Sequence, residues 1–185
     1  MPGLCVEMTP ENYTFPILKK AQFVTALGIM PIIIDQIPHQ LNGDRMIDFT
    51  SKLGRKAKSH LKQEYFIWLT TVDSQGAPQP RPVWFVWDED TILIYSQPGA
   101  FKLKHIINNP NVALHFNTAD PKGEEDLIIF KGTAKIDPKT QPVNKMPAYI
   151  RKYRAGIKGL NSEPEPFAKE YSTAIRIKLT SLRGW

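Results

Sequence analysis

A hydroxyl and an ammonium group lie close together in the middle of the chain. Tyr95, Ser96 and Gln97 end an apolar segment, and Lys102 follows at the start of a predicted helix. A hydroxyl, a cation and the positive end of a helix dipole are groups with which proteins hold phosphate. The sequence therefore predicts that an anionic group lies against Ser96, Gln97 and Lys102, where a strand gives way to a helix.

The run of residues 83–87, upstream of this site, is apolar at every position. A strand with one solvated face would alternate apolar and polar residues, so both faces should be covered. Two interpretations stay open: the strand is sandwiched inside its own barrel, or a second subunit or a planar ligand covers one face. We expect one of Trp84 and Trp87 to face inward and the other to face that partner or ligand.

The elements around these residues follow from apolar spacing. An amphipathic stripe predicts a helix from Met46 to Leu61, and a second stripe predicts one with Tyr149, Tyr153 and Ile157 on one side. Strands are predicted over residues 65–72, 77–88, 91–96, 111–117, 126–136 and 173–180, with a short helix over 98–107. That short helix should turn Ala100, Leu103 and Ile107 inward, and residues 163–166 should end the helix before the last strand.

Six strands with short connections predict a small antiparallel barrel, mainly β and of α+β class, with flanking helices. Pro78, Pro80 and Pro82 confine the start of the second strand to an edge, because proline lacks an amide proton. We divide the chain into an N-terminal extension, 1–45, and a barrel domain, 46–185. The extension is expected to be weakly ordered, and a second reading makes Met46 the biological start.

Composition restricts the setting of this domain. The 185 residues are 42% hydrophobic and contain one cysteine, Cys5, which predicts one globular domain in a reducing compartment, with a cytoplasmic location as the expectation. The apolar stretch 21–34 contains Pro31 and is too short to span a membrane. No histidine or cysteine cluster has metal-ligand spacing, so no metal site is predicted.

The net charge of +6 includes a basic cluster at Arg151, Lys152, Arg154 and Lys158. This cluster is either a solvated helix face or a binding surface for an anionic ligand. Nucleic acid is disfavoured as a partner, because the aromatic residues sit in apolar runs rather than among the positive charges. The motifs of Rossmann, P-loop, zincin and nucleophile-elbow enzymes are absent from the sequence.

Two segments carry a resemblance to a known superfamily. The sequence R-P-V-W-F at 81–85, followed by I-Y-S-Q-P-G-A-F-K-L-K-H at 94–105, resembles the flavin-binding segment of the pyridoxamine phosphate oxidase-like split barrels. Residues 65–87 and the closing L-R-G-W resemble its deazaflavin (coenzyme F420)-dependent oxidoreductase branch. The resemblance covers about residues 46–185 and implies a six-stranded split barrel.

The resemblance also assigns roles to single residues. In the oxidases, FMN phosphate is held by residues that correspond here to Arg81, Ser96 and Lys102. Two further phosphate contacts of that family are replaced by Ala100 and Phe101. Val86 and Leu127 replace two other residues typical of true pyridoxamine phosphate oxidases, so vitamin B6 oxidation is not expected.

These assignments agree with the chemistry of the residues. A flat cofactor needs an apolar slot with backbone amides at its rim, which Pro82, Val83 and Trp84 could provide. We therefore expect an oxidoreductase that transfers a hydride between bound F420, or alternatively FMN, and a small organic substrate. The cluster containing Arg151 and Lys152 would match the polyanionic extension of F420, if its helix lies beside the phosphate site. No catalytic residue stands out.

Other functions stay open on the same barrel. A non-catalytic cofactor carrier is one alternative, and a haem-binding protein with His105 or His115 as ligand is another. The two-faced strands predict a homodimer, with the cofactor site at or near the subunit interface. No nucleic acid and no membrane partner is expected.

Overall fold

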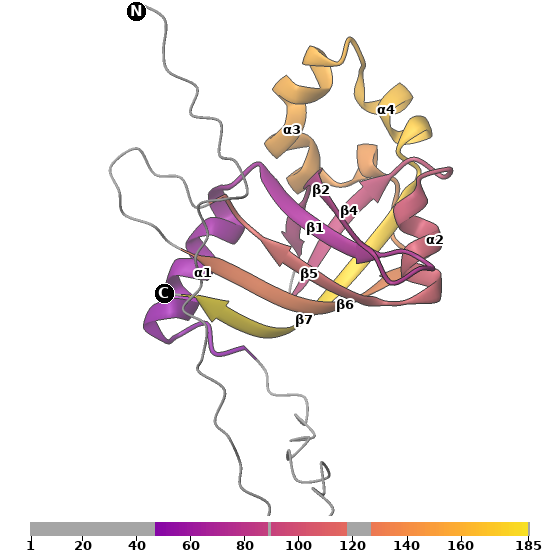
Figure 1. Cartoon of the computed structure of the whole chain (residues 1–185). Coiled ribbons are helices and arrows are strands. Elements are labelled where there is room, and N and C mark those ends of the chain that lie inside the picture. The colour runs from indigo at the N-terminus through magenta and orange to yellow at the C-terminus, as the bar shows by residue number, and fades with distance from the viewer. Residues whose placement is uncertain (1–46, 89, 118–126, 185) are drawn as a thin grey trace, which may run out of the picture. The chain divides into compact units, whose positions relative to one another are not determined.

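The computed structural model describes residues 47–88, 90–117 and 127–184 (Figure 1). The predicted extension 1–45 lies outside the described residues. The elements are α1 (Lys52–Gln63), β1 (Phe66–Val72), β2 (Pro78–Trp84), β3 (Val86–Asp88), β4 (Thr91–Ser96), α2 (Phe101–Asn108), β5 (Asn111–His115), β6 (Ile128–Ile136), η3 (Val143–Lys145), α3 (Pro147–Gly159), α4 (Pro164–Glu170) and β7 (Thr173–Gly184).

The described strands form one antiparallel sheet in the order β2-β1-β5-β6-β7-β4-β3. The sheet curls until β2, near one end of this order, approaches β4 near the other (Figure 1). No ladder joins β2 to β4 among the described strand pairs, so the barrel is split along this line. The predicted split barrel of α+β class with flanking helices is confirmed.

The number of strands differs from the prediction, because residues 77–88 do not form one strand. The strand is interrupted at Phe85, a fully buried residue that separates β2 from β3. Its amide donates to the Tyr153 hydroxyl at 2.8 Å, and its carbonyl accepts from the Lys152 ammonium at 3.0 Å. Side chains of α3 thus replace ladder partners at this point, and the sheet has seven strands rather than six.

Two helices begin later than predicted. The first starts at Lys52 rather than Met46, because the Ser51 side chain caps it by accepting a hydrogen bond from the Gly54 amide at 3.0 Å. The short helix α2 starts at Phe101 rather than residue 98. It buries Leu103 and Ile106, whereas Ile107, which we expected to face inward, is 70% exposed.

A further helix, α4, follows directly where residues 163–166 were expected only to end the preceding helix. Pro164 occupies its first position, where a proline needs no amide partner and its fixed φ suits the helix. The final strand also runs to Gly184 rather than Thr180, and it pairs with β6 between Ile175 and Gly184. Among the described helices, none is long and apolar enough to cross a membrane.

Two hydrophobic cores explain the apolar run 83–87. One fills the barrel and includes Phe85, with Trp87 packed against it. The other lies between the sheet and the helices α3 and α4, and it includes Val86, with Trp84 packed against it. The second face is therefore covered by the chain's own helices α3 and α4, and not by the barrel itself as the first of the two interpretations expected.

Candidate functional site

The split between β2 and β4 leaves room for a ligand. The β3 ladder reaches only Thr91 to Leu93 of β4, so Tyr95 and Ser96 pair with β7 alone. A cavity of about 400 Å³ opens here. It is lined by residues of β1, β2, β4 and the helices: Phe66, Pro82, Val83, Trp84, Tyr95, Ser96, Lys102, Tyr149, Leu160, Phe167 and Tyr171.

One end of this cavity can hold an anion. The Lys102 ammonium donates a hydrogen bond to the Ser96 hydroxyl at 3.1 Å, and Ser96 is buried. Burial lowers the pKa of Lys102, and the positive charge of Arg81 lowers it further. Two cations are thus held near each other beside a buried hydroxyl, and Ala100 at the start of α2 has no side-chain oxygen to cap that helix. An anion placed here would be stabilised by all of these groups.

The rest of the cavity is aromatic. The Trp84 ring stacks on Tyr153 at a centroid distance of 4.6 Å and 5° between planes, and on Phe167 at 5.8 Å and 26°. Gly156 on α3 makes this packing possible, because a Cβ there would lie 2.7 Å from the Trp84 ring. Trp84 and Phe167, with Tyr149 and Tyr171, give the cavity a largely aromatic wall.

The structure brings six of the predicted cofactor contacts into this one cavity. They are Pro82, Val83, Trp84, Tyr95, Ser96 and Lys102. Arg81 is exposed on β2 and lies close enough to influence the pKa of Lys102, although it does not line the cavity. On β3, Asp88 forms an ion pair with Arg176 at 2.7 Å.

Gln97, Arg151 and Lys152 do not line the cavity. The Gln97 side-chain amide donates to Glu170 at 2.6 Å. The Lys152 ammonium donates to the Phe85 carbonyl and lies 3.9 Å from the centroid of the Phe85 ring. Burial lowers the pKa of Lys152 to about 8, against the opposing influence of Glu64. Cofactor contact by these three residues stays a prediction that this geometry does not support.

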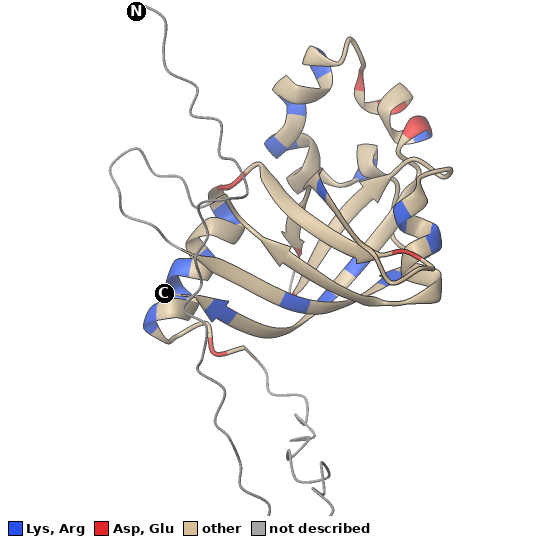
Figure 2. Ribbon diagram, viewed as in Figure 1, with Lys and Arg blue, Asp and Glu red and all other residues tan. Residues whose placement is uncertain are grey.

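Several basic residues lie on α3 (Figure 2). Four of them line a second depression, which we call the α3 hollow. It measures about 510 Å³ and is lined by Tyr65, Phe66, Trp84, Arg151, Lys152, Tyr153, Arg154, Ala155, Gly156 and Lys158. Phe66 and Trp84 border both the hollow and the cavity. A strand advances about 3.3 Å per residue, so Trp84 lies roughly 10 Å along β2 from Arg81. The α3 hollow is therefore at the end of the cavity away from Arg81.

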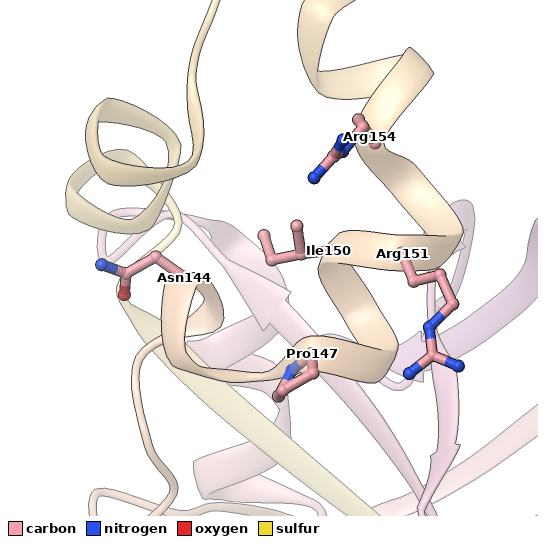
Figure 3. A pocket seen from close by; sticks show the side chains of 5 residues that line it. All are labelled: Asn144, Pro147, Ile150, Arg151 and Arg154. Carbon is pink, nitrogen blue, oxygen red and sulfur yellow. The ribbon is translucent and has the colours of Figure 1, made fainter.

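A third depression of about 640 Å³ lies beside α3, and Asn144, Pro147 and Ile150 are among its lining residues (Figure 3). Arg151 and Arg154 line this depression as well as the α3 hollow. The two guanidinium groups project from α3 in different directions (Figure 3).

Sequence reasoning missed several residues of the cavity: Phe66, Tyr149, Leu160, Phe167 and Tyr171. Phe167 and Tyr171 come from α4 and the residue that follows it, which the sequence signals only through a proline at the first helical position. Tyr149 had been assigned to the core by its spacing, and it is indeed buried while also contributing to the cavity wall.

Comparison with known proteins identifies the family. The family described as pyridoxamine 5'-phosphate oxidase matches residues 53–185. The chain belongs to this family. The family includes oxidoreductases, and it binds flavins. No curated protein matches the sequence.

Solved structures share the fold of this family member. A conserved hypothetical protein from Mycobacterium tuberculosis has a TM-score of 0.59 at 15% identity, covering 71% of this chain and 82% of that chain. General stress protein 26 from Bacillus anthracis has a TM-score of 0.54 at 21% identity, with coverages of 70% and 91%. A protein described as an F420 reductase has a TM-score of 0.53 at 22% identity, with coverages of 68% and 94%.

Proposed function

We propose that the protein is an oxidoreductase that transfers a hydride between a flat flavin-type cofactor, F420 or FMN, and a small organic substrate. The observation that carries this proposal is the contact of Lys102 with Ser96 at one end of a cavity whose walls are aromatic. A flavin combines an anionic group with a large flat ring, and family membership supports a flavin here.

The residues of the split fit such a cofactor. Its phosphate would accept hydrogen bonds from Lys102 and Ser96, near Arg81 and the start of α2. Its charge would offset the repulsion between the two cations, which otherwise contributes to the low pKa of Lys102. The ring would lie along residues 82–84, at the edge of β2 that is open toward β4. When bound, this ring supplies the hydride chemistry, while the chain holds it, orients it and excludes water.

The resemblance of residues 65–87 to deazaflavin-dependent enzymes favours F420 over FMN. The basic residues of α3 were expected to hold the extension of F420, on condition that their helix lay beside the phosphate site. They line the α3 hollow instead, beyond Trp84 and away from the end that holds Lys102. The proposal therefore does not depend on Arg151 or Lys152.

Exposed apolar side chains support the proposal of a homodimer. Phe101 and Ile107 on α2 are 68% and 70% exposed, and Leu160, which lines the cavity, is 55% exposed. A second copy that covers Leu160 would bring the subunit interface to the cavity. Light scattering after size-exclusion chromatography should give twice the chain mass, and a monomer at every concentration would refute the dimer.

The cofactor is tested by titrating the apoprotein separately with FMN and with F420 while following ligand fluorescence. We expect saturable binding of at least one, and binding of one alone identifies the cofactor. Binding of neither by protein that is folded by circular dichroism would overturn the proposal.

A non-catalytic carrier is the second candidate function. Among the residues that line the cavity there is no carboxylate and no histidine, so a protein proton donor or acceptor would have to be a tyrosine or Lys102. Single-turnover mixing of the reduced, protein-bound cofactor with a panel of small organic acceptors separates the two. Oxidation no faster than that of the free cofactor for every acceptor would favour the carrier.

A further inference from the structure

We propose that the α3 hollow binds a phosphorylated nucleotide. A nucleotide that carries a nicotinamide ring would be the second reactant of the redox reaction proposed above, with one hydride passing between that ring and the bound cofactor. The phosphates would bind the cations of α3, and the base would stack on Tyr65, the exposed residue just before β1. Binding in the hollow can be measured without turnover, although its role as a reactant site rests on the proposed function.

The charged residues that line the hollow are all basic. Arg151, Arg154 and Lys158 are exposed and separated by three and four positions, so their Cα atoms lie along one stripe of α3. All three line the hollow together with Lys152, and no acidic residue is among the lining residues. Guanidinium groups can bind phosphate through two parallel hydrogen bonds, which makes this face suited to a phosphate ester.

Aromatic side chains adjoin these cations. Tyr65 and Phe66 line the same hollow and are 57% and 53% exposed. The Tyr65 ring lies edge-on to Tyr153, with centroids 6.1 Å apart. An exposed ring beside positive charge is the arrangement on which nucleobases stack. The sequence separates Tyr65 widely from α3, so only the fold brings the aromatic and basic groups together.

The position of the hollow suits a second reactant. It shares Phe66 and Trp84 with the cofactor cavity, at the end away from Arg81. A ligand there would border the place assigned to the cofactor ring while leaving Lys102 and Ser96 to the cofactor phosphate. Its volume of about 510 Å³ lies within the usual range for small-molecule sites, which favours a free nucleotide over a nucleic-acid strand.

The test measures binding by calorimetry with ADP, NADP⁺ and sodium tripolyphosphate as probes, at fixed ionic strength. Both nucleotides should bind saturably, and more tightly than tripolyphosphate, which has no base. Replacing Arg154 and Lys158 together by Ala removes two exposed cations and should raise the Kd of ADP at least about tenfold. The matched control replaces Lys131 and Lys135 on β6, which are also exposed but lie outside the hollow, and should leave the Kd unchanged.

A second variant, Tyr65→Ala, separates a nucleotide site from a merely basic surface. It should weaken ADP binding severalfold and leave tripolyphosphate binding unchanged. Equal weakening of both probes, or equal effects of the α3 and β6 double variants, would overturn the proposal. Binding of oligothymidylate that tightens with strand length would do so in favour of nucleic acid.

Cofactor titrations of the same variants keep the two proposals distinguishable. The Arg154 and Lys158 double variant should bind FMN and F420 as the wild type does. If the double variant loses affinity for F420 but binds ADP as the wild type does, the hollow receives the F420 extension. This result would overturn the nucleotide site and leave the proposed function standing. Failure of both cofactors to bind the wild type, with ADP binding intact, would overturn the proposed function and the reactant role, leaving a nucleotide site.

Discussion

The Tyr153 hydroxyl bridges the amide and the carbonyl of Phe85. It accepts from the amide at 2.8 Å and lies 2.7 Å from the carbonyl, to which it can donate. The Tyr65 carbonyl lies 2.8 Å away as a second acceptor for the same proton. One side chain of α3 thus satisfies buried backbone groups where β2 ends, and it fixes the helix beside the cavity wall.

Removing this hydroxyl should destabilise the fold. In Tyr153→Phe the buried Phe85 amide loses its partner, which should lower the free energy of unfolding by about 1–3 kcal/mol. Urea denaturation measures the change. The control is Tyr65→Phe, whose side chain is exposed, and it should stay within about 0.5 kcal/mol of the wild type. Equal effects of the two substitutions would contradict the bridging role.

Gly156 should be required for the cavity wall. In Gly156→Ala the new methyl group meets the Trp84 ring, so the ring must shift, at a cost of about 1–3 kcal/mol in stability. Because Trp84 lines the cavity, affinity for the cofactor should fall as well. Gly159→Ala is the matched control on the same helix, since nothing lies within 4 Å of a Cβ there. It should be neutral or stabilising by up to about 1 kcal/mol. If Gly156→Ala binds the cofactor with unchanged affinity, the cofactor does not contact Trp84.

Lys102 should contribute to cofactor binding far more than its neighbour on α2. Lys102→Met removes a charged donor from the cavity and should raise the Kd of the cofactor at least about tenfold. Lys104→Met, two positions along, alters an exposed lysine outside the cavity and should leave the Kd within about twofold of the wild type. Fluorescence titration of both variants gives the comparison, and similar values would exclude a phosphate contact by Lys102.

Lys152 should make the free energy of unfolding depend on pH in the alkaline range. Its pKa is about 8 in the folded chain, against 10.5 as the ordinary value. Between these values the unfolded chain holds more protons at this site, so the free energy of unfolding should rise with pH. In Lys152→Met this contribution disappears, and the difference between wild type and variant should grow in favour of the wild type from pH 8 to 9.5. Urea titrations at several pH values measure it, and a constant difference would contradict the low pKa.

The sequence predicted the strand end at Ser96 and the helix that carries Lys102, because local spacing determines both elements. It also predicted the proline-rich edge strand. It did not predict the break at Phe85, since an unbroken apolar run looks like a continuous strand. The reason for that break lies on α3, where Tyr153 and Lys152 bind the Phe85 backbone. Such partners are distant in sequence and have no local signal.

The same limit explains the incomplete prediction of the site. Pro82, Val83, Trp84, Tyr95, Ser96 and Lys102 come from two segments whose pattern indicated a ligand, and the cavity contains all of them. Phe167 and Tyr171 reach it only through the packing of α4 on the second core. The basic residues of α3 were recognisable as a cluster, but their side of the helix depended on tertiary packing.

The three prolines of β2 bear on why the barrel stays split. Pro78, Pro80 and Pro82 alternate along the strand, and Gln79, Arg81 and Val83 lie between them. Since a proline nitrogen cannot donate to the β1 ladder, all three belong at positions whose nitrogen points outward. The outer edge of β2 thus lacks an amide proton at three successive outward-pointing positions. Neither β4 nor a strand of another molecule can therefore form a regular hydrogen-bonded ladder with it. The split between β2 and β4 therefore cannot close by strand pairing, and it stays open to a ligand.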